Sequence, residues 1–189
     1  MEAQGRTATG GTGGKGTGRV LLTLVVPTRN EVDNVAELVR GLREGLAGVD
    51  FRIVFVDDST DGTPGVIRDL AEEDGRVMLV HRESAEQEGG LSTAVTTGME
   101  LFAGESEFTC VMDADGQHPP EKVREMLEVA RSGEADVVVA SRYARGGSYE
   151  GLSGRARRAV SLGSKSLARV VFKEARKTTD PMTGFFLVR

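Results

Sequence analysis

Short apolar runs alternate with amphipathic stretches along most of this chain. Continuous runs rich in β-branched residues predict buried strands, and apolar residues recurring every three or four positions predict helices. The predicted strands are residues 20–26, 51–56, 77–80, 108–112, 136–140 and 184–188. The predicted helices are residues 31–46, 63–73, 91–102, 119–130 and 155–172. This alternation is typical of an α/β domain with a buried, largely parallel sheet.

Polar segments follow four of the predicted strands, at residues 27–31, 57–60, 113–115 and 141–143. In open α/β sheets, ligands bind outside the carboxyl ends of the strands. We therefore expect these segments to converge on one rim of the sheet and to form a single binding site.

The segment 109–120, TCVMDADGQHPP, ends a buried strand with two aspartates, Asp113 and Asp115. Their spacing along an extended segment puts both carboxylates on one side. Gln117 adds a further side-chain oxygen, and ligands made only of oxygen suit Mg²⁺ or Mn²⁺. The alternative is an ordinary turn, because Asp, Gly and Pro are common turn residues.

A second acidic cluster follows the strand 51–56. Asp58 is predicted to accept hydrogen bonds from a base or ribose, and Glu31 is a candidate for the same role. Asp61, Gly62 and Thr63 are assigned to structure, with Thr60 or Asp61 capping the following helix.

Composition places the chain among globular proteins. It has 189 residues, of which 39% are hydrophobic and 28% charged. It contains one cysteine, Cys110, which lies in an apolar run and is expected in the core. No apolar run reaches the roughly 18–20 residues that span a bilayer. Residues 1–18 are rich in Gly and Thr and predict a disordered tail; their glycines precede the first strand, which argues against a phosphate-binding loop.

The formal net charge of −5 conceals a basic segment at residues 142–177. This segment holds ten Lys or Arg and two acidic residues, against 14 basic and 27 acidic residues elsewhere. A nucleic-acid-binding protein usually has a broader basic excess, so no nucleic-acid partner is expected. The segment suits an anionic substrate or an anionic membrane surface, and the alternative is a solvated helix face.

Four ordered motifs, at residues 26–31, 56–63, 112–119 and 180–186, resemble those of glycosyltransferase family 2. More narrowly, they are similar to polyprenol-phosphate mannosyltransferases, the dolichol-phosphate mannose synthase group. The resemblance covers about residues 21–189. It implies the A-type glycosyltransferase fold, in which a single α/β domain binds a nucleotide sugar and an Asp-x-Asp motif binds a metal ion.

The same resemblance implies roles for individual residues. The expected nucleotide-sugar-binding residues are Pro27, Arg29, Glu31, Val56, Asp58, Gly90 and Ser92. The expected metal ligands, for Mg²⁺ or Mn²⁺, are Asp113, Asp115 and Gln117. The acceptor phosphate is expected to contact Arg142, Arg157 and Ser161, and the catalytic residues to be Asp113, Asp115 and Arg142. Relatives often have an aromatic or hydroxylated residue at the position of Arg29, which leaves its contact with the base open. Residues 90–94 are also compatible with a plain helix start.

The implied reaction is a metal-dependent transfer of a hexose, with mannose from GDP-mannose as the first choice, to polyprenyl or dolichyl phosphate with inversion. A phosphate monoester is largely dianionic at neutral pH and needs no general base. His118, at a helix entry, is expected to be structural or peripheral, and His81 to be an ordinary strand-end residue. Asp180 would act as a base with a hydroxyl acceptor. The alternatives are a UDP-sugar donor, a sugar-hydroxyl acceptor, or a catalytically inactive nucleotide-binding module.

The predicted organisation is a tail at residues 1–18 and a catalytic domain at residues 19–189, truncated at its C-terminus. Relatives of this kind continue with strands and interface helices. We expect a peripheral protein at the cytoplasmic face of a membrane, attached through the basic segment or through a region beyond residue 189.

Overall fold

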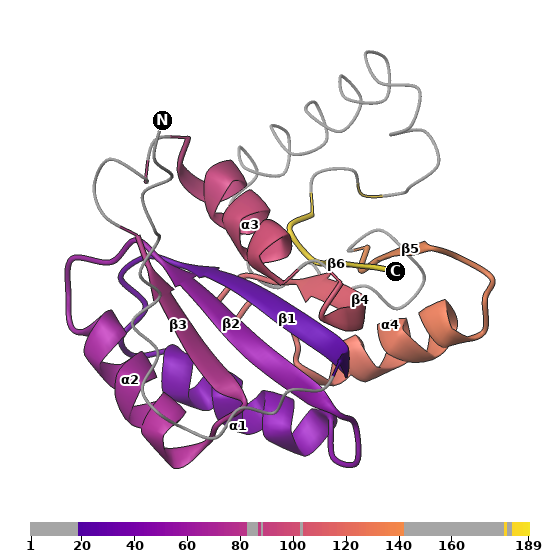
Figure 1. The fold of residues 1–189 in the computed structure, drawn as a ribbon, viewed down its shortest axis with the longest axis horizontal. Coiled ribbons are helices and arrows are strands. Elements are labelled where there is room, and N and C mark those ends of the chain that lie inside the picture. The colour runs from indigo at the N-terminus through magenta and orange to yellow at the C-terminus, as the bar shows by residue number, and fades with distance from the viewer. Residues whose placement is uncertain (1–18, 83–86, 88, 103, 142–179, 181–182) are drawn as a thin grey trace, which may run out of the picture.

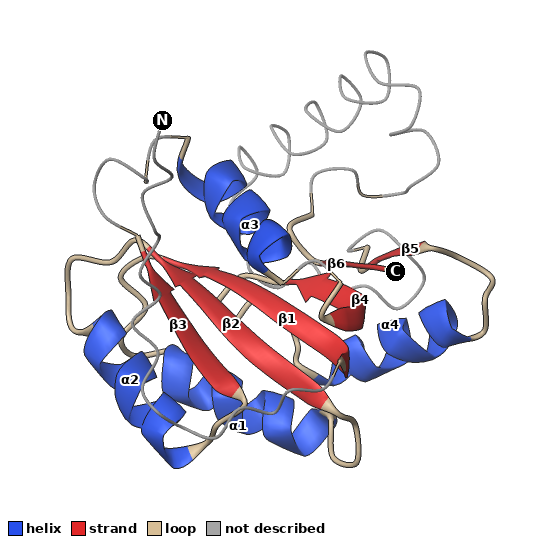
Figure 2. Cartoon of the chain, viewed as in Figure 1, coloured by secondary structure: helices blue, strands red, loops and turns tan. Residues whose placement is uncertain are grey.

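A six-stranded sheet with helices on both faces organises the part of the chain that the computed structural model describes, residues 19–82, 87, 89–102, 104–141, 180 and 183–189 (Figures 1 and 2). The strands are β1 (Val20–Thr28), β2 (Phe51–Asp57), β3 (Val77–His81), β4 (Ser106–Val111), β5 (Val137–Val139) and β6 (Phe186–Val188). The helices are α1 (Val35–Gly45), α2 (Thr63–Glu73), α3 (Gly90–Leu101) and α4 (Glu121–Arg131). The predicted α/β class is confirmed.

The strand order β3-β2-β1-β4-β6-β5 places β1 near the middle of the sheet. β1 pairs in parallel with both β2 and β4, and β2 pairs in parallel with β3. From β3 the chain returns through α3 to β4, on the other side of β1. The strand order therefore reverses between β1 and β4, and such a switch point is where α/β sheets bind ligands.

The two faces of the sheet are covered unequally (Figure 1). Helices α1, α2 and α4 pack on one face, over a core that includes Leu22, Phe55 and Met112. Among the described helices, α3 packs on the other face, over a smaller cluster that includes Val25 and Val56. The central strands β1 and β2 are buried on both sides, which explains why their sequences read as continuous apolar runs.

Helix α3 lies close against the sheet because a glycine faces the strands. A Cβ atom at Gly98 would lie 2.5 Å from Cγ1 of Val25 and 3.0 Å from Cγ2 of Val56. The absence of a side chain there sets the distance between the helix and the sheet, and it brings the first turn of α3 beside the strand ends.

Most strand and helix boundaries differ from the predicted ones by a few residues, and three differences have a clear physical reason. α1 begins at Val35 rather than at residue 31, because the backbone N–H groups of Asn34 and Val35 both donate to the carbonyl of Glu31 in a turn. α4 begins after its N-cap, Pro120. β6 is antiparallel to both of its neighbours, a direction that hydrophobic patterning does not encode. The predicted helix at 155–172 and the tail at 1–18 lie outside the described residues.

Candidate nucleotide-sugar site

A cavity of about 330 Å³ lies at the switch point between β1 and β4. Its walls come from the segments after β1, β2 and β4 and from the first turns of α3. The lining residues are Pro27, Thr28, Arg29, Glu31, Asp58, Gly90, Leu91, Ala94, Asp113, Ala114 and Asp115. The predicted convergence is therefore present for three of the four polar segments, and the fourth lies mostly outside the described residues.

The loop after β1 is held in place by the loop after β2. Asn30 has a left-handed backbone (φ 58°), and its N–H donates to Oγ of Ser59 at 2.7 Å. Its side-chain oxygen accepts from the N–H of Thr60 at 2.9 Å. The N–H of Glu31 donates to Oγ1 of Thr63 at 3.0 Å, so both loops move as one unit. This tie fixes the backbone that carries Arg29 and Glu31 to the cavity.

Asp57 is fully buried beneath these loops. Its carboxylate accepts a hydrogen bond from the Ser59 hydroxyl at 2.5 Å and lies 2.7 Å from Nδ1 of His81. His81 ends β3, as predicted, and it also neutralises a buried acidic group when it is protonated. Asp57 therefore supports the loops from inside the protein.

Asp58 lines the cavity, but its carboxylate already has a cationic partner. Arg82 donates from Nε to Oδ1 of Asp58 at 2.7 Å and from an NH2 group to Oδ2. Both side chains are almost completely buried, so this is a desolvated, bidentate ion pair. A carboxylate has about four acceptor sites, so Asp58 keeps acceptor capacity for a ligand. Sequence analysis missed Arg82, whose one signal was a charged residue directly after a predicted strand.

Asp113 and Asp115 both face the cavity, as predicted from their spacing. Burial raises the pKa of Asp113; the nearby His118 opposes this shift, and the negative charge of Asp115 adds to it. The Asp115 carboxylate accepts from the backbone N–H of Gln117 at 3.0 Å. The segment is thus both a turn and a pair of converging carboxylates, and the two interpretations of the sequence are compatible.

His118 fixes the position of Asp113. Its Nδ1 accepts from the backbone N–H of Asp113 at 2.9 Å, and its ring stacks on Phe185 with the centroids 4.8 Å apart. Gly184 leaves room for the carboxylate, since a Cβ there would lie 3.1 Å from Oδ2 of Asp113. His118 is therefore a structural residue, as expected, and it acts directly behind the acidic pair.

The chemistry of the acidic pair fits a hard divalent cation. Among the described residues, no Lys or Arg forms an ion pair with Asp113 or Asp115; the nearby basic side chain is His118, whose Nε2 lies 3.7 Å from Oδ2 of Asp113. The described part of the chain also has no cluster of three or more His, Cys, Asp or Glu side chains that could hold a metal by itself. Two carboxylates completed by substrate phosphates and water are the usual coordination of Mg²⁺.

Three of the predicted ligand residues do not line the cavity. Val56 is fully buried and packs in the core under α3, so its side chain supports the cavity from below. Ser92 is exposed on α3, whose cavity-facing residues are Gly90, Leu91 and Ala94. Gln117 is exposed, and its recorded contact is the backbone donation to Asp115. The predicted acceptor residues Arg142, Arg157 and Ser161 lie outside the described residues.

A parallel sheet with its cavity at the switch point and an Asp-x-Asp pair at the cavity wall is the arrangement of the A-type nucleotide-sugar transferases. The sequence profile of glycosyl transferase family 2 matches residues 23–189, and the chain belongs to this family. The resemblance found in the four motifs is thereby confirmed.

Two curated relatives indicate the narrower group. The dolichol-phosphate mannosyltransferase of Pyrococcus furiosus is 34% identical over 169 residues, which cover 89% of this chain and 46% of the relative. The polyprenol monophosphomannose synthase of Mycolicibacterium smegmatis is 35% identical over 127 residues, covering 66% of this chain and 46% of the relative. The chain thus spans about half the length of these relatives. No helix in the described part of the chain is long and apolar enough to cross a membrane.

Solved structures agree on the fold. Mannosyl-3-phosphoglycerate synthase from Rubrobacter xylanophilus superposes with a TM-score of 0.63 at 23% identity, covering 89% of this chain and 53% of that one. A mannosyltransferase from Pyrobaculum calidifontis, solved with GDP-mannose and Mn²⁺, gives a TM-score of 0.53 at 26% identity. That match covers 66% of this chain and 36% of the other. The predicted A-type fold is confirmed.

Proposed function

We propose that the protein is a metal-dependent, inverting hexosyltransferase that moves mannose from GDP-mannose to a polyprenyl phosphate. The observation that carries this proposal is the pair Asp113 and Asp115, two carboxylates without a Lys or Arg partner among the described residues, at the wall of a cavity at the switch point. The relatives named as dolichol-phosphate and polyprenol-phosphate mannose synthases support the choice of sugar and acceptor.

Binding of the donor divides between two sides of the cavity. Glu31 and Asp58 offer carboxylate oxygens to the N–H and hydroxyl groups of a nucleoside, and Arg29 adds a cation at the exposed side. Asp113 and Asp115 hold the metal, with Gln117 near enough in sequence to join them. A bound Mg²⁺ or Mn²⁺ would stabilise the negative charge of the departing diphosphate.

The acceptor phosphate attacks without a general base. Its second pKa is near 6, so it is largely dianionic at neutral pH. A phosphate oxygen forms a bond to the anomeric carbon as the bond from that carbon to the diphosphate breaks, and GDP leaves. A single displacement inverts the anomeric centre. In agreement with this, both histidines of the chain, His81 and His118, have structural partners in Asp57 and Asp113.

The proposed acceptor residues Arg142, Arg157 and Ser161 belong to the basic segment at 142–177. A segment of this charge would bind the phosphate and the anionic surface of the cytoplasmic leaflet. This part of the proposal rests on the sequence and on the acceptors in the names of the relatives.

The test is a binding screen of the 189-residue chain by calorimetry, with GDP-mannose, UDP-glucose and dTDP-glucose in the presence and absence of Mn²⁺. We expect GDP-mannose to bind only with Mn²⁺. We expect Asp113→Asn to abolish this Mn²⁺-dependent binding. Asp69→Asn, an exposed change on α2, is the matched control and should bind as the unmodified chain does. A metal-dependent preference for UDP-glucose would replace the donor in this proposal. Binding of GDP-mannose without any transfer or hydrolysis would indicate a catalytically inactive nucleotide-binding module, and the absence of binding by every sugar nucleotide would contradict the proposed function.

Mannosyl transfer to a short polyprenyl phosphate, followed by mass spectrometry of the product, tests the acceptor. Transfer to mannose or to another free sugar instead of the lipid phosphate would contradict the lipid-phosphate assignment.

A further inference from the structure

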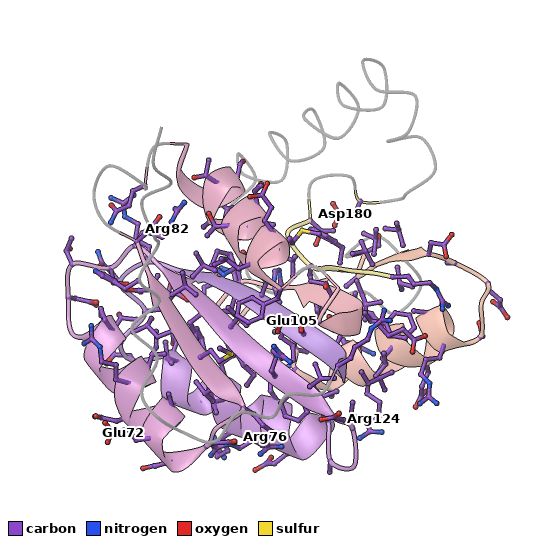
Figure 3. The ribbon with its side chains drawn as sticks, viewed as in Figure 1. Glu72, Arg76, Arg82, Glu105, Arg124 and Asp180 are labelled. Carbon is purple, nitrogen blue, oxygen red and sulfur yellow. The ribbon has the colours of Figure 1, made fainter. Side chains whose placement is uncertain are left out.

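Arg82 is the most deeply buried basic residue of the described chain, with 2% of its surface exposed, and it does not line the cavity. It lies directly after β3, on the side of the sheet where α3 begins, whereas Arg76 lies at the opposite end of that strand (Figure 3). A buried arginine needs partners for its charge and for its donors.

The partners of Arg82 belong to two different walls of the cavity. On one side, its guanidinium makes the bidentate pair with Asp58. On the other side, one NH1 group donates to Oγ1 of Thr93 at 2.8 Å, and an NH2 group donates to the carbonyl of Gly90 at 3.2 Å. Arg82 therefore bridges the residue after β2 and the first turn of α3.

The first turn of α3 is shaped to make this bridge. Gly89 and Gly90 both have left-handed backbones, with φ of 88° and 58°. A Cβ at Gly89 would lie 2.5 Å from Cγ2 of Thr93, so that turn closes tightly on Thr93. The Thr93 hydroxyl also donates to the carbonyl of Gly90 at 3.0 Å. Arg82 thus holds a turn that would otherwise be weakly constrained, since glycine has high backbone freedom.

We propose that Arg82 is a positioning residue that couples the nucleoside side of the cavity, at Asp58, to the sugar-facing side, at the first turn of α3. This inference rests on the proposed function, because it assigns the two walls to the two halves of a nucleotide sugar. Arg82 touches neither half itself. It sets the orientation of the Asp58 carboxylate and the positions of Gly90 and Leu91 at the cavity wall.

The geometry of the guanidinium explains why this position holds an arginine. Four of its N–H directions are used, two on Asp58 and two on the α3 turn. A lysine is a point charge with three donors on a flexible stem, and it cannot make a planar, two-sided bridge. We therefore expect Arg82→Lys to fold but to lose the coupling.

The sharpest variant is Thr93→Val, which keeps the shape of the side chain and removes the acceptor for Arg82. Its matched control is Thr96→Val on the same helix, since the Thr96 hydroxyl donates only locally to the carbonyl of Ser92. In calorimetry with Mn²⁺, we expect Thr93→Val to weaken GDP-mannose binding by about fivefold, as for the loss of one charge-assisted hydrogen bond, and Thr96→Val to leave it unchanged.

A double-mutant cycle distinguishes coupling from two independent contacts. If Arg82 joins the walls, the effects of Asp58→Asn and Thr93→Val on the Kd for GDP-mannose will depart from their product by at least about twofold. Effects that multiply within error would overturn the proposal, even if each variant alone binds more weakly.

Hydrogen exchange tests the bridge without any ligand. We expect Asp58→Asn and Arg82→Lys to speed exchange of the amides in the first turns of α3, with α2 unchanged and with Thr96→Val as the reference. Exchange at the unmodified rate in α3 of Asp58→Asn would overturn the inference. A chain that binds no sugar nucleotide at all would overturn the proposed function instead, and the exchange result would still decide the role of Arg82.

Discussion

Two aspartate pairs follow two strands of the same sheet, and they have opposite electrostatic surroundings. Asp57 ends β2 and Asp58 follows it; both have partners inside the protein, Asp57 in His81 and the Ser59 hydroxyl and Asp58 in Arg82. Asp113 and Asp115 follow β4, and the described residues supply them with one histidine and one backbone N–H. The charge partners of the first pair lie inside the protein, although Asp58 also lines the cavity, and we propose that a metal ion binds the second pair.

The comparison favours the second pair as the metal site, because no described Lys or Arg compensates its negative charge. Burial and like charge both favour the neutral form of a carboxyl group. The pKa of Asp113 is raised for these reasons. A bound divalent cation reverses this, because it stabilises the ionised form. The four predictions below test this contrast, from the largest expected effect to the smallest.

Removal of one carboxylate of the second pair should cost activity and leave the fold intact. We expect Asp115→Asn to lower metal-dependent mannosyl transfer by about 1,000-fold, as for the loss of several kcal/mol of charge stabilisation. The free energy of unfolding should stay the same or rise slightly, because a like-charge repulsion is relieved. Steady-state kinetics and urea unfolding measure the two effects. Transfer within tenfold of the unmodified rate would show that the pair does not hold the catalytic metal.

Removal of one carboxylate of the first pair should lower the stability of the fold and leave the metal dependence of transfer intact. Asp57→Asn places an amide nitrogen where a fully buried acceptor is needed, and we expect a loss of about 2–4 kcal/mol in the free energy of unfolding. The residual transfer activity should keep its dependence on Mn²⁺, measured at a temperature where the variant is folded. A variant as stable as the unmodified chain would show that the Asp57 network contributes nothing to the fold.

Two glycine substitutions test how α3, which lines the same cavity as the second pair, is held against the sheet. Gly98→Ala should destabilise the protein by about 1–3 kcal/mol, because the new methyl group meets Val25 and Val56. Gly65→Ala on α2 is the matched control, since nothing lies within 4 Å of its Cβ position. It should stabilise the protein by up to about 1 kcal/mol through helix propensity. Equal melting temperatures for the two variants would contradict the close packing of α3.

An aspartate near the surface gives the weakest effect. The hydrogen bond from the Arg76 side chain lowers the pKa of Asp74 to about 2. A lowered folded-state pKa adds stability above the unfolded value of 3.8, and this contribution is lost as the pH falls from about 3.8 to about 2. We expect Asp74→Asn to cost about 0.5–1 kcal/mol at pH 7, because solvent screens the pair.

The difference in the free energy of unfolding between Asp74→Asn and the unmodified chain should shrink at pH 2–2.5. Urea unfolding of both chains at each pH measures it. A difference independent of pH would assign the effect to packing rather than to charge.

The sequence predicted most of the fold because its strands are buried on both faces. β1 and β2 read as continuous apolar runs, and the apolar stripe of α1 at Val35, Leu38 and Leu42 matches its buried face. The direction and place of β6 could not be predicted, since pairing between distant segments depends on chain topology. For the same reason the order of the strands was not available from the pattern.

The site was predictable where a residue's role follows from its place after a strand, and not where the role depends on a distant partner. Asp113, Asp115, Glu31 and Asp58 reach the cavity because parallel strands bring their carboxyl ends together. Val56 and Ser92 were predicted from matching motifs, but neither side chain reaches the cavity. Strand alternation turns the side chain of Val56 into the core, and helical rotation places Ser92 on an exposed face of α3. Arg82 was missed, since its side-chain partners Asp58 and Thr93 lie 24 and 11 positions away.

The sequence by itself determined the family, the α/β class and the four polar segments, because these depend on local periodicity and on residues close together in the chain. The tertiary structure decided which aspartates are neutralised and which remain available to a cation. That outcome depends on His81, Arg82 and His118, which contact Asp57, Asp58 and Asp113 across the fold.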